Sequence, residues 1–310
     1  MKSQDPELAE AARIAIKDSL KVARDEKVMI ITNPGSEVYA VSMALYEASL
    51  EAGAHPTILV QDTKGQMDYA EEAVIAAFES QPDVVISLSE EKLGKDRSGM
   101  ETPYEWDGVN YDHVFHYQLR GARTLRAFWS PGITVELFKS TVPIDYRQLQ
   151  DRCVRLKAVL EGSVSLRVSN AKGTAVSLGL VGRQARMDDG NFASPGSGGN
   201  LPAGEVFVSP ALGSTEGTIV FDGSIANARG DIIIREPIRC TVKGGFVTAI
   251  SGGEEARMLE ATLDEAASRA RAMGEDGSLP RDKAEAYARN ARGIGELGIG
   301  LNPRAKIVGN

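Results

Sequence analysis

The sequence predicts an α/β protein: an N-terminal parallel-sheet α/β domain followed by a mixed α+β domain rich in antiparallel strands. Three observations support this. In the first part, short apolar runs rich in branched residues alternate with helical periodicity, the arrangement that builds parallel sheets. In the second part, alternating strands follow one another through glycine-containing turns, as antiparallel hairpins do. A length of 310 residues exceeds one typical domain, so we expect two, residues 1–150 and 151–310.

The elements of the first domain follow from the spacing of its apolar residues. An amphipathic helix with charges throughout is expected over residues 1–20. Strands are predicted at 27–32, 56–62 and 83–89, and helices at 38–52, 69–78, 113–128 and 146–160. Residues 90–112 are charged and turn-rich and predict a long surface loop. The segment between 128 and 146 carries two prolines and predicts no regular element.

The second domain is expected to consist mainly of hairpins and then helices. Alternating segments predict strands at 163–170, 174–182, 217–223 and 238–250, and helices are predicted at 254–273 and 282–290. Residues 171–173 and 243–245 contain the glycines of two hairpin turns.

Composition excludes some classes of function. There are 35 Lys and Arg residues against 43 Asp and Glu residues, a formal net charge of −8. A non-specific nucleic-acid binder needs a basic face, so we expect no nucleic-acid partner. No apolar run is long enough to cross a bilayer, and the N-terminus lacks the apolar core of a signal peptide. We therefore expect a cytoplasmic protein with no membrane partner.

Three groups of polar residues are weak candidates for a site. The turn at 32–36 offers N–H groups to a phosphate but lacks the glycine spacing of a dinucleotide fingerprint, and a helix-capping turn is favoured. His113 and His116 would share a helix face as a metal pair, although their aromatic neighbours favour a partly buried surface. Asp188 and Asp189 suit either a cation or an acidic turn, and the turn is favoured.

Two glutamates in glycine-rich runs are stronger candidates. Glu205 directly precedes the apolar run 206–208, and Gly204 is expected to leave open space beside its carboxylate. Glu296 is bracketed by four glycines within GIGELGIGLNP, where a plain surface helix would use stronger helix formers. The alternatives are a solvated strand end for Glu205 and a flexible tail for Glu296.

Three motifs together resemble the aminopeptidase T family of leucyl metalloaminopeptidases. They are NLPAGEVF at 200–207, ELGIGLNP at 296–303, and PGITVELF at 131–138 with IDY behind it. The resemblance implies a homodimer with a dinuclear metal site in the second domain, and its metal ligands fall on Glu205 and Glu296. It implies zinc, cobalt or manganese as cofactor, and a metal-dependent hydrolase that removes N-terminal residues from peptide substrates.

The sequence departs from that pattern in its histidines. The family continues through further ligands, including histidines, whereas no histidine follows residue 116 here. We expect either that a C-terminal segment is missing or that this is a shortened relative without metal chemistry, and the first is favoured. The general base and the remaining ligands are therefore unassigned, and these residues alone are expected to hold little or no metal.

Two rival functions remain. Non-haem iron dioxygenases that open hydroxylated pyridine rings share the fold and need two histidines and one carboxylate. A glutamate stands at the ELGIG position here, where that group is expected to differ. A non-catalytic binding or assembly protein is the third possibility.

Overall fold

The computed structural model describes residues 5–227 and 230–307, which fold into two compact units. Unit 1 falls within residues 1–153, 188–205 and 300–305, and unit 2 takes the rest of the chain. Two segments, 188–205 and 300–305, thus return to unit 1 after the chain has entered unit 2. Residues 1–4 of the predicted first helix and the last three residues of the chain lie outside the described residues.

Unit 1 is built on a parallel sheet of five strands, as the sequence predicts for its core. The strands lie in the order β10-β6-β3-β1-β2, and every pair is parallel. Three of them match the sequence prediction, and two come from segments for which no strand is predicted. The strands are β1 (Lys27–Thr32), β2 (His55–Val60), β3 (Val84–Leu88), β6 (Arg126–Trp129) and β10 (Gly198–Asn200).

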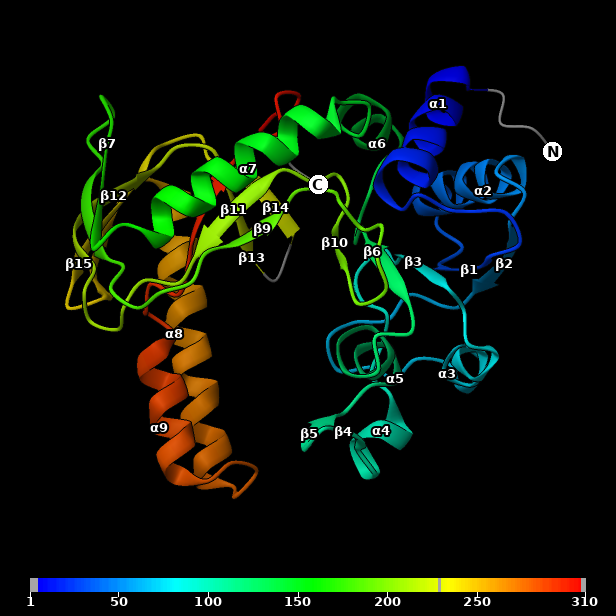
Figure 1. Ribbon diagram of the computed structural model, residues 1–310. Helices are drawn as coiled ribbons and strands as arrows, with labels where there is room; N and C mark the ends of the chain where they lie inside the picture. Colours follow the sequence, from blue (N-terminus) through cyan, green and yellow to red (C-terminus); the bar gives the residue numbers. More distant parts are fainter. Residues whose placement is uncertain (1–4, 228–229, 308–310) are drawn as a thin grey trace. The chain divides into compact units, whose positions relative to one another are not determined.

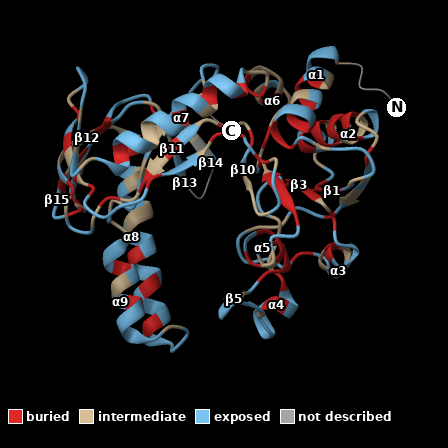
Figure 2. Ribbon diagram, in the orientation of Figure 1, coloured by how far each residue is buried: buried red, intermediate tan, exposed pale blue. Residues whose placement is uncertain are grey.

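Helices cover both faces of this sheet (Figure 1). On one face, α2 (Ser36–Glu51) packs with α1 (Pro6–Ile14) and α6 (Val135–Thr141). On the other face lie α3 (Glu72–Ala77) and α5 (Val114–His116), the latter continued by a helical turn over Tyr117–Gly121. Side chains alternate across a strand, so Met29 and Ile31 enter the core on the α3 and α5 face. Figure 2 shows the resulting burial of β1 and β3.

Three predictions for unit 1 are wrong. Residues 126–128, predicted as the end of a helix, belong to strand β6, because a short apolar run has no periodicity that separates the two states. Residues 135–141 form helix α6, capped by the Thr134 side chain, where no element is predicted. The predicted loop at 90–112 contains helix α4 (Arg97–Glu101) and a hairpin of β4 (Tyr104–Trp106) and β5 (Val109–Tyr111).

Unit 2 contains the predicted hairpins. Its antiparallel sheet has the order β16-β15-β12-β8-β7, formed by β7 (Ser165–Ser169), β8 (Ala175–Gly179), β12 (Glu216–Phe221), β15 (Ile238–Lys243) and β16 (Phe246–Ser251). Gly244 and Gly245 have φ of +56° and +82°, the left-handed conformation that a two-residue hairpin turn requires. A second, two-stranded sheet pairs β13 (Ser224–Asn227) with β14 (Gly230–Ile233).

The rest of unit 2 is helical, with one further small sheet. Helix α7 (Tyr146–Glu161) carries the chain into this unit, and α8 (Glu254–Glu275) and α9 (Arg281–Asn290) pack as a hairpin. Most residues of β9 (Arg186–Asp188), β11 (Glu205–Val208) and β17 (Leu297–Gly300) belong to unit 2, in the sheet order β17-β11-β9. Within residues 5–227 and 230–307, no helix combines the length and the apolar character that a bilayer span requires.

Candidate functional site

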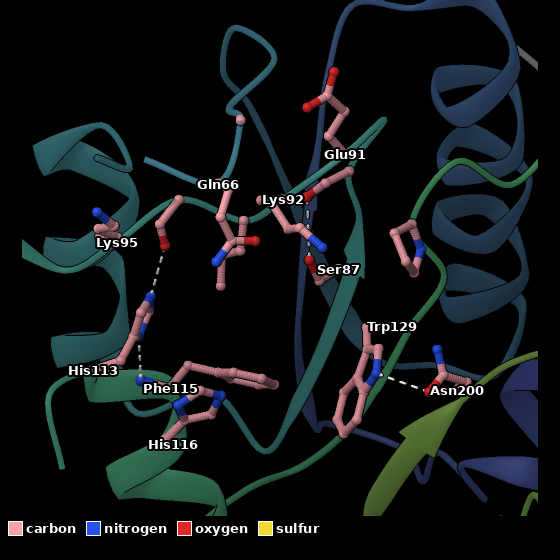
Figure 3. Close-up of a pocket in the computed structure, with 15 residues that line it drawn as sticks. Gln66, Ser87, Glu91, Lys92, Lys95, His113, Phe115, His116, Trp129 and Asn200 are labelled. Atoms are coloured by element: carbon pink, nitrogen blue, oxygen red, sulfur yellow. Dashed lines mark hydrogen bonds between the residues drawn. The ribbon is translucent and has the colours of Figure 1, made fainter. Parts of the chain in front are cut away.

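A cavity of about 450 Å³ opens at the carboxyl edge of the parallel sheet in unit 1 (Figure 3). This is the edge at which open α/β sheets bind their ligands, and the volume lies in the range of small-molecule sites. The ends of β3, β6 and β10, the segments 65–66 and 91–95, and the start of α5 surround it. Its lining includes Ser87, Ser89, Lys92, Phe115, His116, Trp129 and Asn200.

A buried asparagine holds together the loops that frame the cavity. Asn33 directly follows β1 and has no exposed surface. Its Nδ2 donates to the carbonyl oxygens of Gln61 and Asp62, at 2.8 and 3.2 Å, and its Oδ1 accepts from the Glu90 N–H at 2.7 Å. The loops after β1, β2 and β3 are thereby tied to one side chain.

In the turn at 32–36, a carboxylate of the protein itself lies at the start of α2. The Glu90 carboxylate lies against Gly35, the residue that precedes α2, in the space that a side chain at Gly35 would fill. The same carboxylate accepts a hydrogen bond from the Thr63 hydroxyl. Helix N-termini attract anions, and here the protein supplies its own carboxylate at that position.

His113 is a capping residue with both ring nitrogens in use. Its Nδ1 accepts from the Phe115 N–H at 3.1 Å, so Nε2 carries the proton and donates to the Gly94 carbonyl at 3.2 Å. Burial, and then the neighbouring His116, lower the pKa of His113. His116 lies at the cavity rim with its ring centroid 5.6 Å from that of His113, and partial burial lowers its pKa as well. Both imidazoles are therefore neutral at pH 7.

Two aromatic rings form a corner inside the cavity. The centroids of Phe115 and Trp129 are 6.1 Å apart, and the ring planes are nearly perpendicular at 89°. The Trp129 Nε1–H donates to Asn200 Oδ1 at 3.1 Å, which fixes the indole and leaves the Asn200 amide nitrogen as a donor. A flat ring would find an apolar face here beside polar groups, which suits a small heteroaromatic molecule.

The acidic pair 188–189 helps to position this corner. Asp188 Oδ2 accepts from the backbone N–H of Asn200 at 2.7 Å, which holds the end of β10. Burial raises the pKa of Asp188 to about 7, and the charges of Asp189 and Glu205 add to the shift. Asp189 instead closes a turn, since its Oδ1 accepts from the Asn191 N–H at 3.0 Å. The turn interpretation therefore describes Asp189, whereas Asp188 supports the cavity.

Glu205 begins β11, as predicted, but Gly204 does not leave open space. A Cβ at Gly204, whose φ is +129°, would lie 2.8 Å from the backbone nitrogen of Asn302. Leu301 N–H donates to the Gly204 carbonyl at 2.7 Å, and Asn302 Nδ2 donates to the Ala203 carbonyl at 2.9 Å. The glycine is required because two backbone segments approach closely, which is a packing requirement.

Glu296 lies in unit 2 beside a different hollow. That hollow, of about 560 Å³, is also lined by Arg183, Arg186 and Phe207, and Arg183 Nε donates to the Ser209 carbonyl at 2.7 Å. Glu205 belongs to unit 1 and Glu296 to unit 2, so a shared metal site remains a prediction. Across the part of the chain that the structure describes, no three His, Cys, Asp or Glu residues are grouped as metal ligands.

Sequence reasoning named His113 and His116, which line the cavity, but missed Ser87, Ser89, Trp129 and Asn200. Ser87 and Ser89 fall at the end of the predicted strand 83–89. Because open parallel sheets bind ligands at the carboxyl ends of their strands, that position could have identified both serines as candidates. Trp129 falls just after the predicted helix 113–128, in a segment for which no strand was predicted. Asn200 joins the sheet only through β10, which pairs with β6 by tertiary contact.

The architecture of unit 1, an open parallel sheet with a ligand-sized cavity at its carboxyl edge, is that of α/β enzymes. Residues 9–308 match the sequence profile of the enzyme family described as 2,5-dihydroxypyridine 5,6-dioxygenase, and the chain belongs to this family. A protein of that name from Pseudomonas putida KT2440 is 30% identical over 161 residues, which span 50% of this chain and 39% of that protein.

Solved structures agree at the level of the fold. The structure of 2,5-dihydroxypyridine dioxygenase from Pseudomonas putida KT2440 matches with a TM-score of 0.66 and 20% identity, covering 96% of this chain and 77% of that chain. AmpT from Thermus thermophilus matches with a TM-score of 0.56 and 16% identity, covering 95% of this chain and 78% of that chain. Both confirm the predicted combination of a parallel-sheet α/β part and antiparallel sheets.

The assignment to the aminopeptidase T family is therefore wrong, and so are the expected classes of hydrolase, protease and metalloprotease. One of the motifs behind it has a packing role in this structure. In NLPAGEVF, Gly204 allows the approach of Asn302, a requirement of packing that any chemistry on this fold would keep. The comparisons give no support to zinc, cobalt or manganese as the cofactor.

Proposed function

We propose that this chain is a ring-opening dioxygenase that acts on a hydroxylated pyridine of the 2,5-dihydroxypyridine type. The family match over residues 9–308 is the observation that carries the proposal. A 5,6-dioxygenase breaks the ring bond between C5 and C6 and places both atoms of O₂ in the product, so no external reductant is needed. This was the alternative expected from the sequence, and it replaces peptide hydrolysis.

We assign ring binding to the cavity of unit 1. The pyridine ring packs against Trp129, whose indole is held in place by Asn200. The Asn200 amide and the neutral His116 imidazole at the rim offer hydrogen bonds to ring hydroxyl groups. Because the His116 imidazole is neutral, it can accept a proton from a hydroxyl without first losing one.

A metal, non-haem iron in this proposal, would supply the activation of oxygen. The described residues do not provide a ligand set for it. Both nitrogens of His113 bind the backbone, and no group of three potential ligands is present within residues 5–227 and 230–307. The iron and the expected homodimer are therefore both proposals.

Oxygen consumption tests the activity. With 2,5-dihydroxypyridine and added ferrous iron, we expect one O₂ consumed for each ring lost, and no cleavage of peptide p-nitroanilides. Failure to consume O₂ with any of ferrous iron, manganese or cobalt would refute the proposed reaction.

A pair of tryptophan variants tests the assigned cavity. Trp129→Ala should weaken binding of the ring by about tenfold or more, since stacked aromatic contacts contribute on the order of 1 kcal/mol beyond the area they bury. Trp106→Phe is the matched control, because Trp106 lies in β4, is 47% exposed and does not line the cavity. Equal affinity in both variants would rule out the cavity as the ring site.

A further inference from the structure

The lining of the unit 1 cavity includes a positively charged side chain, Lys92, for which an uncharged dihydroxypyridine offers no partner. Lys92 lies four residues after β3, and its backbone N–H donates to the Lys64 carbonyl at 3.0 Å, which fixes this part of the rim. Figure 3 shows its ammonium group turned toward Ser87. Glu91 also lines the cavity, with a carboxylate oxygen 3.6 Å from where a Cβ of Gly65 would lie, and both Glu91 and Lys92 are exposed.

The neighbouring charges leave Lys92 as the cation that faces the cavity. Lys64 Nζ pairs with the Glu71 carboxylate at 2.5 Å. Lys95 also lines the cavity, but its ammonium lies 3.5 Å from Met67 Sδ and 5.9 Å from the centroid of the Tyr69 ring. The ion pairs found among the described residues do not include Lys92.

Two buried serine hydroxyl groups also line the cavity. The side chains of Ser87 and Ser89 are 6% and 3% exposed, and their Oγ atoms are 3.4 Å apart. One hydroxyl can donate to the other, which leaves a proton for a further acceptor. The Lys92 ammonium and the two serine hydroxyls line the same cavity, and such donors can bind the two oxygens of a carboxylate through strong, charge-assisted hydrogen bonds.

We propose that the natural ligand of this cavity is a hydroxylated pyridine that bears a carboxylate, which binds Lys92, Ser87 and Ser89 while the ring packs against Trp129. The inference rests on the proposed ring-opening function and narrows its substrate class. The acid is a recognition group and takes no part in breaking the ring bond. An acid at ring position 4 leaves the bond between C5 and C6 as it is in the bare ring.

Calorimetric titration of the whole chain without metal or oxygen tests this. The two probes are 2,5-dihydroxypyridine and the same ring with a carboxylate at C4. We expect the acid to bind about tenfold more tightly, the effect of one or two hydrogen bonds to a charged group. Lys92→Met should abolish that preference and leave the affinity for the bare ring unchanged.

Lys95→Met is the matched control, a second lysine of the same cavity whose ammonium lies elsewhere, and it should keep the preference. Equal affinity of the native chain for the two probes, or a loss of both affinities in Lys92→Met, would overturn the inference. The oxygen-consumption assay separates this from the reaction itself. Turnover without an acid preference refutes only the carboxylate site, whereas a Lys92-dependent preference without turnover refutes only the dioxygenase reaction.

Discussion

The raised pKa of Asp188 predicts how the stability of unit 1 depends on pH. Burial is the leading cause of the shift to about 7, and the charges of Asp189 and Glu205 add to it. The folded chain therefore holds this proton more tightly than the unfolded chain, in which the pKa is about 3.9. The free energy of unfolding contributed by Asp188 is complete below about pH 4 and is lost as the pH rises toward 7.

The size of the effect follows from the same shift. One group changes the free energy of unfolding by at most about 1.4 kcal/mol per pH unit, so three units correspond to about 4 kcal/mol at most. Asp188→Asn removes the titration, and its side-chain oxygen can still accept from the Asn200 N–H. Between about pH 4.5 and 6.5, the native protein should lose stability relative to this variant by about 1 kcal/mol per unit.

Urea unfolding followed by tryptophan fluorescence measures this directly. The chain has two tryptophans, Trp106 and Trp129, and both lie in unit 1, so the signal reports that unit. Asp189→Asn is the control, since it removes a neighbouring charge and leaves the burial of Asp188, the leading cause. Parallel pH profiles for the native protein and Asp188→Asn would show that the reasoning about burial is wrong.

Three further changes test the packing of unit 1. Glu26→Gln leaves the buried Arg126 guanidinium without the carboxylate it contacts at 2.7 Å, and should lower the free energy of unfolding by about 3 kcal/mol in urea; an unchanged midpoint would contradict this. Asp96→Asn should bring the pKa of Tyr104, which burial and Asp96 raise to about 12, closer to 10 in an ultraviolet titration. Phe78→Ala should cost about 3–5 kcal/mol, because Phe78 is fully buried, and a loss below about 1 kcal/mol would mean that the site collapses freely.

Local pattern was sufficient for much of the fold. The run at 27–32 was predicted as a strand and is β1 over the same residues, because a short run of branched apolar residues is typical of a strand buried on both faces. The glycines at 244 and 245 marked a hairpin turn because their backbone conformation is one that other residues avoid. Helix α7 was predicted at 146–160 and covers Tyr146–Glu161.

Strand β6 shows where local pattern fails. Its first residue, Arg126, is charged yet only 4% exposed, because Glu26 and the carbonyl of Leu20 accept its hydrogen bonds. These partners lie about a hundred residues earlier, and no window of sequence around Arg126 contains them. From the local sequence alone, Arg126 followed by a short apolar run is compatible with a helix and with a strand.

The candidate site depended on tertiary structure for a similar reason. Its aromatic corner joins Trp129 to Asn200, which are 71 positions apart, and Asp188 holds Asn200 in place from a third segment. The sequence instead drew attention to glutamates in glycine-rich runs. Gly204 is required because the backbone of Asn302 approaches it closely. The motif around Glu205 therefore indicated the fold correctly but led to the wrong reaction class.

The sequence by itself determined many of the helices and strands, the parallel and antiparallel character of the two parts, and the position of several turns. These properties depend on neighbours within a few residues, since apolar spacing and backbone conformation act locally. Only the tertiary structure decided which polar side chains meet at the sheet edge and which carboxylate lies in a setting that raises its pKa. Those properties depend on segments far apart in sequence, because burial and charge act through space rather than along the chain.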